Sequence, residues 1–466
     1  MLSEDVLYLP VSELANRIRA RKLSPVELTE SYFERSARLG PQLNAYVTLT
    51  KELALEQAHA AEREIAAGHY RGPLHGIPYA AKDLLAVQGY PTTWGARPYA
   101  QQTFNYDATV ITRLREAGAV LIGKAAMIEL AGGMGYRFAS ASLTGAAKNP
   151  WNGTCWTCGS SSGSGAIVAA ALAAFAIGTE TWGSIICPSA YCGISGLRPT
   201  FGRVSRYGAM ALAYSMDKIG PMARSAEDCA LVLAAIAGYD GKDRSSLSPS
   251  EAAFRYPSPG PSRLRIGWVT NAWKKMAPDI ATSAQAAIEA LKSHSAKVAD
   301  AQLPEGPWEE AANTNVAVEG AAAFHSLIES GRVTELSDPL GKIAGYVNEQ
   351  ISASDYLRAM QIRGILQRKV DELFDRFDVL AAASLPITAT PLEMNLETDL
   401  TFPDPLGGIG NFCGLPAISV PCGLSEKKLP IGIQFVGRVR NDRAVLAAAQ
   451  LFQQHTDWHR KRPPIA

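Results

Sequence analysis

The sequence is short of charged residues and of cysteine. Charged residues make up 19% of the 466-residue chain, and 45 Lys and Arg against 44 Asp and Glu leave a formal charge of +1. This balance lacks the basic excess of a chain that binds nucleic acid by itself. Seven cysteines are too few, and odd in number, for a disulfide framework, so we expect a reducing cytoplasm as the location.

The sequence also lacks an apolar run that could cross a membrane. The most apolar stretch, residues 166–177, is only a dozen residues long, whereas a bilayer needs about 20. Residues 1–20 contain no basic-then-apolar secretory segment. We therefore predict a buried helix over 166–177 and no membrane partner. Hydrophobic residues reach 47% of the chain, which is enough for an extensive globular core.

The pattern of apolar residues is typical of an α/β fold. Ser24 followed by Pro25, Val26 and Glu27 predicts a capped helix start, and a second helix is expected at about 51–67. From Gly72 onward, short apolar runs alternate with Gly or Pro turns and helical stretches, which indicates a central sheet. The expected core segments are 77–81, 108–117, 119–123, 264–269, 379–383, 417–420 and 431–436.

We predict one large domain over residues 1–466, with its sheet completed from both ends of the sequence. Its expected parts are N-terminal helices (1–70), a core (71–237), a helical insert that lines the substrate site (238–375), and C-terminal core strands with a helix (376–466). The polar, Ser- and Pro-rich stretch at about 238–261 is interpreted as a loop rather than a domain break.

Two serine-containing segments rich in small residues suggest chemistry. Residues 158–165 read Cys-Gly-Ser-Ser-Ser-Gly-Ser-Gly, and residues 178–184 read Gly-Thr-Glu-Thr-Trp-Gly-Ser. Small neighbours let backbone N–H groups converge on an oxyanion, as a nucleophilic serine requires. A flexible turn that caps a helix is the competing interpretation, and composition alone favours it. The Lys-Ser/Thr pair of a phosphate-binding P-loop is missing.

A nucleophilic serine needs a base, and the usual base is histidine. None of the seven histidines lies in the serine-rich segments, although one can still be close in space. Lys82, at the end of the apolar run 77–81, is an alternative base. A lone lysine at a strand end is, however, normally a solvated surface charge.

An ordered series of motifs resembles the amidase signature family. The motifs are Gly76-Ile77-Pro78 with Lys82-Asp83, Asn149-Pro150-Trp151, Gly159-Ser160-Ser161, Gly183-Ser184-Ile185, residues 189–200 with 202–205, residues 107–110 and 123–124, and Gly414-Leu415-Pro416-Ala417. The resemblance runs from about residue 14 to 439. It implies a single large fold with a central mixed, twisted sheet flanked by helices on both sides.

The resemblance also implies a Ser-cis-Ser-Lys triad. Its members fall on Ser184 as nucleophile, Ser160 as bridging serine in a cis peptide, and Lys82 as base. The oxyanion hole falls on backbone N–H groups of Thr181, Trp182 and Gly183, together with Ser184 itself. Lys82 must be neutral to accept a proton, so burial has to lower its pKa toward about 7 or 8. No cofactor and no metal are implied.

This chain departs from the family pattern in the nucleophile loop. Trp182 stands where Gly is usual and adds a ring beside the expected oxyanion hole, and Ile186 stands where Arg is usual, so Glu180 needs another partner. Cys158 and Ser162 also replace Gly.

A second departure concerns the expected acyl pocket. The segment 132–136, which the family commonly makes polar, is apolar and glycine-rich here. Together with Trp156 and Trp182 it can line a pocket for an aromatic or hydrophobic substrate, and ordinary core packing is the equal alternative. The candidate substrate-binding residues are Gly132, Gly133, Met134, Tyr136 and Trp156.

The remaining cysteines do not suggest a metal site. Cys155 and Cys158 form a CxxC pair, but no second pair lies at zinc-finger distance. A loop cysteine pair is the preferred interpretation. Cys187 and Cys192 are interpreted as small buried hydrophobic residues.

Two functions fit the resemblance. The first is an amidohydrolase that cleaves C–N bonds of small amides, aryl amides or carbamates, and also esters, with a homodimer as one possible assembly. The second is the glutaminase subunit of a tRNA-dependent amidotransferase. That subunit holds the glutamine carboxylate with an Arg, where this chain has Lys342 or Ile343, and the ammonium with an Asp, which falls on Asp404.

Overall fold

A computed structural model describes residues 2–257, 263–294, 296–400 and 403–465. Its strands are β1 (Tyr46–Leu49), β2 (Pro78–Lys82), β3 (Val120–Ala125), β4 (Lys148–Asn149), β5 (Asn152–Trp156), β6 (Phe175–Glu180), β7 (Ser195–Arg198), β8 (Lys218–Ala223), β9 (Arg265–Val269), β10 (Lys297–Ala301), β11 (Val379–Ala383), β12 (Ala417–Leu424) and β13 (Pro430–Gly437).

Helices connect these strands along the chain. They are α1 (Glu4–Leu7), α2 (Val11–Arg19), α3 (Pro25–Leu43), α4 (Lys51–Ala66), α5 (Thr109–Glu116), α6 (Ser162–Ala169), α7 (Ile186–Cys192), α8 (Ala226–Ile236), α9 (Pro249–Ala252), α10 (Pro278–Ser293), α11 (Trp308–Ala323), α12 (His325–Glu329), α13 (Gly341–Asn348), α14 (Ala353–Arg376), α15 (Pro405–Phe412) and α16 (Asp442–Gln454). None of the described helices is long and apolar enough to cross a membrane.

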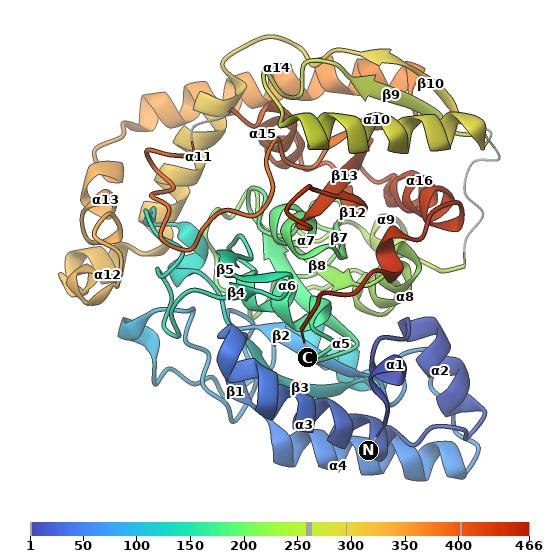
Figure 1. Cartoon of the computed structure of the whole chain (residues 1–466). Helices are drawn as coiled ribbons and strands as arrows, with labels where there is room; N and C mark the ends of the chain where they lie inside the picture. Colours follow the sequence, from blue (N-terminus) through green and yellow to red (C-terminus); the bar gives the residue numbers. More distant parts are fainter. Residues whose placement is uncertain (1, 258–262, 295, 401–402, 466) are drawn as a thin grey trace.

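Eleven of the described strands form one mixed sheet, which confirms the predicted fold class. Their order is β1-β3-β2-β6-β8-β7-β12-β13-β11-β9-β10. Strand β2 is parallel to both β3 and β6, whereas β12 is antiparallel to its neighbours β7 and β13. Helices flank both faces. Figure 1 shows α3 and α4 beside the β1 end of the sheet, and α10 and α14 at the β9–β10 end.

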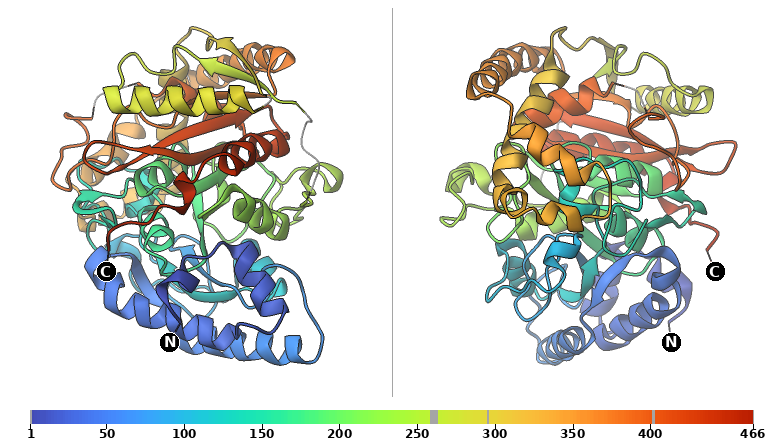
Figure 2. Two further views of the ribbon diagram at one scale, coloured as in Figure 1. Left: turned by 45° about the vertical axis from the view of Figure 1, so that its right-hand side comes forward. Right: turned by 90° about the vertical axis from the view of Figure 1, so that its left-hand side faces the viewer.

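The C-terminal strands lie inside the sheet rather than at an edge. Strands β12 and β13 stand between β7 and β11, and α16 packs against them (Figure 2). The far edge is built by β9 and β10, which belong to the segment predicted as a helical insert. The sequence predicts strand β9 but not β10. The β10 sequence Lys-Val-Ala-Asp-Ala is largely exposed and too polar to predict a core strand.

The prediction of one buried helix over residues 166–177 is wrong. Helix α6 ends at Ala169, and the chain turns at Ala171, which has a left-handed φ of 51°, before β6 begins at Phe175. The whole segment is buried on all sides, so its apolar residues show no helical periodicity that would separate helix from strand. The N-terminal prediction is confirmed, because Ser24 Oγ accepts hydrogen bonds from the N–H groups of Val26 and Glu27 at the start of α3.

Candidate functional site

Three side chains from separate parts of the chain form a continuous hydrogen-bonded relay. Lys82 is the last residue of β2, Ser160 precedes α6, and Ser184 follows β6. Lys82 Nζ donates to Ser160 Oγ at 2.7 Å, and Ser160 Oγ donates to Ser184 Oγ at 3.0 Å. Because β2 and β6 are parallel, their carboxyl ends meet at one edge of the sheet, which brings Lys82 close to the loop of Ser184.

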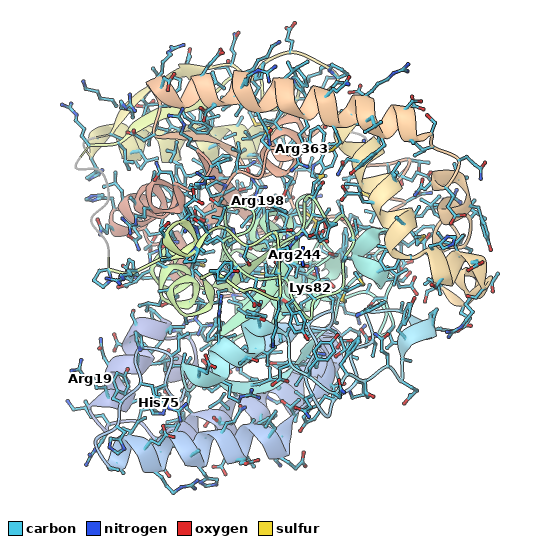
Figure 3. The ribbon with its side chains drawn as sticks, turned by 180° about the vertical axis from the view of Figure 1, so that it is seen from behind. Arg19, His75, Lys82, Arg198, Arg244 and Arg363 are labelled. Carbon is cyan, nitrogen blue, oxygen red and sulfur yellow. A yellow bond between two sulfur atoms is a disulfide. The ribbon has the colours of Figure 1, made fainter. Side chains whose placement is uncertain are left out.

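Lys82 lies in the interior of the molecule, where Figure 3 shows it together with Arg198. Its side chain has no exposed surface, and Nζ donates a second hydrogen bond to Thr179 Oγ1 at 2.9 Å. Burial lowers the pKa of Lys82 to about 7, although the more distant carboxylates of Asp217 and Glu180 act in the opposite direction. A substantial fraction of Lys82 is therefore an uncharged amine near neutral pH, as a base must be.

The carboxylate next to Lys82 in the sequence has a different partner. Successive residues of an extended segment point to opposite sides, so Asp83 does not share the side of Lys82. Asp83 Oδ1 lies 2.8 Å from Lys124 Nζ, and both side chains are completely buried. The N–H of Thr93 donates to the other Asp83 oxygen at 3.1 Å. Asp83 is thereby kept from stabilising the charged form of Lys82.

The loop of Ser184 turns at Gly183 and leaves several backbone N–H groups without backbone acceptors in the described part of the chain. Gly183 adopts a left-handed φ of 78°, whereas Trp182 does not have a positive φ. The loop therefore accommodates Trp at position 182 because the left-handed turn falls on the glycine beside it. The N–H groups of residues 181–184 donate to no backbone carbonyl among the described residues. The Gly159–Ser160 peptide is cis, as the resemblance implies.

Glu180 anchors this loop from the other side of β6. Its Oε1 accepts hydrogen bonds from Arg198 Nη1 at 2.6 Å and from Asn411 Nδ2 at 3.0 Å. Its Oε2 accepts the N–H groups of Ile185 and Ile186 at 2.8 and 2.9 Å. Although burial alone would raise the pKa of Glu180, Arg198 and these hydrogen bonds lower it to about 2. Arg198 is thus the partner that the Arg-to-Ile change at position 186 required.

The indole of Trp182 is directed toward α15. Its Nε1–H donates to Asp404 Oδ2 at 3.0 Å, and its ring covers Gly408, where an added Cβ would lie 2.9 Å from the ring carbon Cζ2. The other Asp404 oxygen accepts the N–H of Gly407 at 3.0 Å. Both oxygens of Asp404 therefore have partners within the protein.

The predicted substrate-binding residues divide into two groups. A cavity of about 180 Å³ beside Gly159 and Gly183 is lined by Tyr136, but not by Gly132, Gly133, Met134 or Trp156. Met134 is almost completely buried, and its sulfur would lie 2.9 Å from a Cβ added to Gly345 of α13. Gly133 similarly faces Phe324.

Trp156 is also almost completely buried, and it contacts Tyr136 edge-on at 6.2 Å between ring centroids. Core packing is therefore the observed environment of Gly133, Met134 and Trp156, whereas Gly132 is partly exposed.

The cysteine pairing differs from the expectation. Cys158 forms a disulfide with Cys187 across 29 residues of sequence, whereas Cys155 and Cys192 are free and buried. The CxxC spacing suggested a local pair, but it contained no information about the fold, which brings the start of α7 beside the Ser160 loop. The low cysteine count led us to expect a reducing cytoplasm as the location. Disulfides are uncommon in that compartment, so the location stays a prediction.

The roles of several residues of the site carried no recognised signal in the sequence, although Thr179 and Arg198 lie within the quoted segments 178–184 and 189–200. Thr179 contacts Lys82, Arg198 neutralises Glu180, and Asp217 accepts a hydrogen bond from Thr181 Oγ1 at 2.5 Å. Period-two alternation along 179–181 is the signal that could have separated Thr179 and Thr181 from Glu180. The partners Arg198 and Asp217 come from other strands and loops, so alternation alone does not reveal them.

The chain belongs to the amidase signature family and is therefore an amidase-signature hydrolase. The family model described as Amidase matches residues 27–446. Among curated relatives, the A subunit of the glutamyl-tRNA(Gln) amidotransferase of Geobacter metallireducens is 34% identical, with 99% of this chain and 100% of the relative covered. The corresponding protein of Moorella thermoacetica is 36% identical, with 99% of each chain covered.

Solved structures of amidases share the whole fold. The peptide amidase of Stenotrophomonas maltophilia superposes with a TM-score of 0.84 at 30% identity, covering 98% of both chains. The 6-aminohexanoate cyclic dimer hydrolase in complex with its substrate gives a TM-score of 0.85 at 26% identity, covering 98% of this chain and 99% of the other.

Replacing Arg198 by Met should unfold the protein more easily, because it leaves the buried carboxylate of Glu180 without its cation. We expect the free energy of unfolding, measured with urea, to fall by about 3–5 kcal/mol. The double variant Glu180→Gln with Arg198→Met should lose less, since no buried charge remains. Equal losses in the single and double variants would show that Arg198 acts through packing alone.

Proposed function

We propose that the protein is a serine amidohydrolase that cleaves C–N bonds of small amides, aryl amides or carbamates through an acyl-enzyme on Ser184. The observation that carries the proposal is the unbroken chain of hydrogen bonds from Lys82 through Ser160 to Ser184. Esters fit the same chemistry. The acyl-enzyme reaction needs no cofactor, because the relay supplies both base and acid.

In the proposed mechanism, the neutral amine of Lys82 accepts the proton of Ser160 while Ser160 takes that of Ser184. Ser184 Oγ then attacks the substrate carbonyl, and the negative charge on the carbonyl oxygen is bound by N–H groups of Thr181, Trp182 and Gly183 with Ser184. The relay runs backwards to protonate the leaving nitrogen, the C–N bond breaks, and Ser184 keeps the acyl group. Water then repeats the cycle and releases the acid.

The second candidate is the glutaminase subunit of a tRNA-dependent amidotransferase. Its support is the full-length similarity to the amidotransferase proteins. Two features of the cavity beside Gly183 favour the first candidate instead. Both oxygens of Asp404 already have partners, and the one cation among the described residues that line this cavity, Arg198, is paired with Glu180.

A glutamine substrate requires partners for an ammonium and a carboxylate. The Arg of the glutaminase falls on Lys342 or Ile343 of α13. Ile343 is exposed and uncharged, and Lys342 is partly buried and does not line the cavity beside Gly183. We therefore infer a small-molecule substrate without a charged α-amino acid group and no direct nucleic-acid partner. Turnover of glutamine only after addition of a second protein would reverse this choice.

Replacing Ser184 by Ala should abolish hydrolysis while the fold stays intact. We expect kcat/KM for an aryl amide to fall by about four orders of magnitude or more, since the nucleophile is lost. Ser164→Ala is the matched control, because Ser164 is a buried serine of α6 outside the relay. Mass spectrometry should find the acyl group on the peptide that contains Ser184, and retained turnover would refute the nucleophile assignment.

The pH dependence of hydrolysis should follow the ionisation of Lys82. Its pKa is lowered to about 7, so the ammonium form that cannot accept a proton dominates below that pH. We expect kcat/KM to rise with pH through about 7 and to level off above it. Lys82→Ala should remove most activity and the rising limb with it. A flat profile between about pH 6 and about pH 9 would mean that another group is the base.

A further inference from the structure

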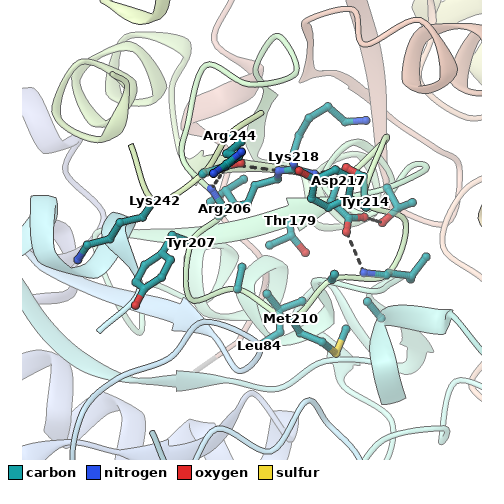
Figure 4. Close-up of a pocket in the computed structure, with 17 residues that line it drawn as sticks. Leu84, Thr179, Arg206, Tyr207, Met210, Tyr214, Asp217, Lys218, Lys242 and Arg244 are labelled. Atoms are coloured by element: carbon teal, nitrogen blue, oxygen red, sulfur yellow. Dashed lines mark hydrogen bonds and ion pairs between the residues drawn. The ribbon is translucent and has the colours of Figure 1, made fainter. Parts of the chain in front are cut away.

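A second and larger cavity lies on the Lys82 side of the nucleophile loop. Its volume is about 370 Å³, which falls in the range of small-molecule sites. Its wall includes Thr179 and Thr181, which flank Glu180 and point to the opposite side of the chain from it. Figure 4 shows Thr179 in the wall of this cavity, and because Thr179 Oγ1 accepts a hydrogen bond from Lys82, the cavity ends one residue away from the proton relay.

The position of the cavity matches the leaving group of the proposed reaction, on which this inference rests. The leaving nitrogen must face Ser160, which stands between Ser184 and Lys82, in order to receive its proton. The acyl carbon stays at Ser184, whose loop borders the smaller cavity through Gly183. We propose that the larger cavity is the subsite for the leaving amine, and that it takes an uncharged aryl or bulky alkyl amine group rather than ammonia.

The wall of the cavity supports an apolar occupant. Figure 4 shows Leu84 and Met210 on one side of Thr179, and the cavity is further lined by Leu212, Ile219, Tyr207 and Tyr214. Ammonia would leave most of this apolar surface without a partner.

Several charges of the wall are matched within the protein, whereas Lys218 Nζ is buried without a hydrogen-bond partner among the described residues, and burial lowers the pKa of this amine. Asp217 accepts the hydroxyl of Thr181 and the N–H of Leu212, and Arg206 contacts Asp243. Asp217, Arg206 and Asp243 therefore do not require a charged ligand.

The experiment compares two amides of one acid that the enzyme hydrolyses, the primary amide and the N-benzyl amide. Ala209, a partly exposed residue of the cavity wall, is replaced by Phe to fill the space. We expect kcat/KM for the N-benzyl amide to fall by about tenfold, while that for the primary amide is unchanged. Ala286→Phe on the exposed face of α10 is the control for added bulk and should affect neither substrate.

Equal effects of Ala209→Phe on both amides, or no effect on either, would overturn the assignment. Ala209→Leu gives the same test with a smaller side chain if the Phe variant does not fold. The result is separable from the proposed function. If Ser184→Ala is inactive but Ala209→Phe does not distinguish the two amides, only the leaving-group subsite fails.

An independent observation concerns the disulfide between Cys158 and Cys187. Cys158 is two residues before Ser160, and Cys187 is three residues after Ser184, so the bond joins the two segments that carry the relay serines. Apart from it, the hydrogen bond between the two hydroxyls at 3.0 Å and that from the N–H of Ser161 to the carbonyl of Ser184 at 3.3 Å link these segments directly. Both cysteines line the cavity beside Gly183.

We infer that Cys158 and Cys187 are positioning residues whose disulfide holds Ser160 and Ser184 at relay distance. A dithiol such as dithiothreitol can reach the bond through the cavity. It supplies two electrons and two protons, becomes a cyclic disulfide, and leaves two thiols on the protein. The freed segments can then move apart. A shift of about 1 Å between reacting groups is enough for a large loss of rate.

Reduction should lower kcat by about tenfold or more with little change in KM, at a temperature well below the unfolding transition. Reoxidation should restore kcat, whereas a loss of kcat caused by unfolding or damage should not be reversed by reoxidation. The Cys187→Ser variant should have the same low kcat with and without the dithiol. Cys155 is a free, buried cysteine, so the control variant Cys155→Ser should lose kcat on reduction as the unchanged protein does. The inference would be overturned if the reduced protein kept its full kcat although alkylation of a sample showed that both thiols were free.

Discussion

The site depends on keeping one amine uncharged in the interior of the protein. Moving the pKa of Lys82 from 10.5 to about 7 corresponds to about 5 kcal/mol of differential interaction between its two protonation states. Entry of solvent or an adjacent carboxylate would raise the pKa of Lys82, so that the amine would be protonated at neutral pH and could not act as a base. The all-buried strand β2 excludes water, and the hydroxyls of Ser160 and Thr179 are neutral partners, which do not stabilise an ammonium as a carboxylate would.

The buried ion pairs around the relay follow from the same constraint. Asp83 is adjacent to Lys82 in sequence, yet Lys124 of the neighbouring strand binds it. Glu180 belongs to the nucleophile loop, yet Arg198 and three further hydrogen-bond donors neutralise and fix it. The loop itself carries Ile186 where the resemblance leads one to expect an Arg, and the cation that pairs with Glu180 is Arg198 of β7. Glu180 is therefore neutralised without a cation in the loop itself.

How much of this could be predicted from the sequence depends on the range of each interaction. The α/β class, the cap at Ser24 and most core strands follow from local patterns, and the ordered motifs identified the residues that form the relay. Contacts between segments far apart in the chain left no local signal. The Cys158–Cys187 bond, the Arg198–Glu180 pair and the packing of Met134 under α13 are of this kind. Residues 166–177 failed for another reason, since uniform burial erases the periodicity that distinguishes helix from strand.

The two cavities together connect the departures of this chain to its substrate. The indole of Trp182 donates a hydrogen bond to Asp404 and fills the space above Gly408. The cavity proposed for the acyl group is therefore small, and its described lining residues offer no unpaired charged group. On the leaving-group side the larger apolar cavity remains open to a substituent on nitrogen. Binding energy is therefore available mainly from the amine portion of a substrate. Since that portion leaves in the first step, interactions there act on formation of the acyl-enzyme and not on its hydrolysis.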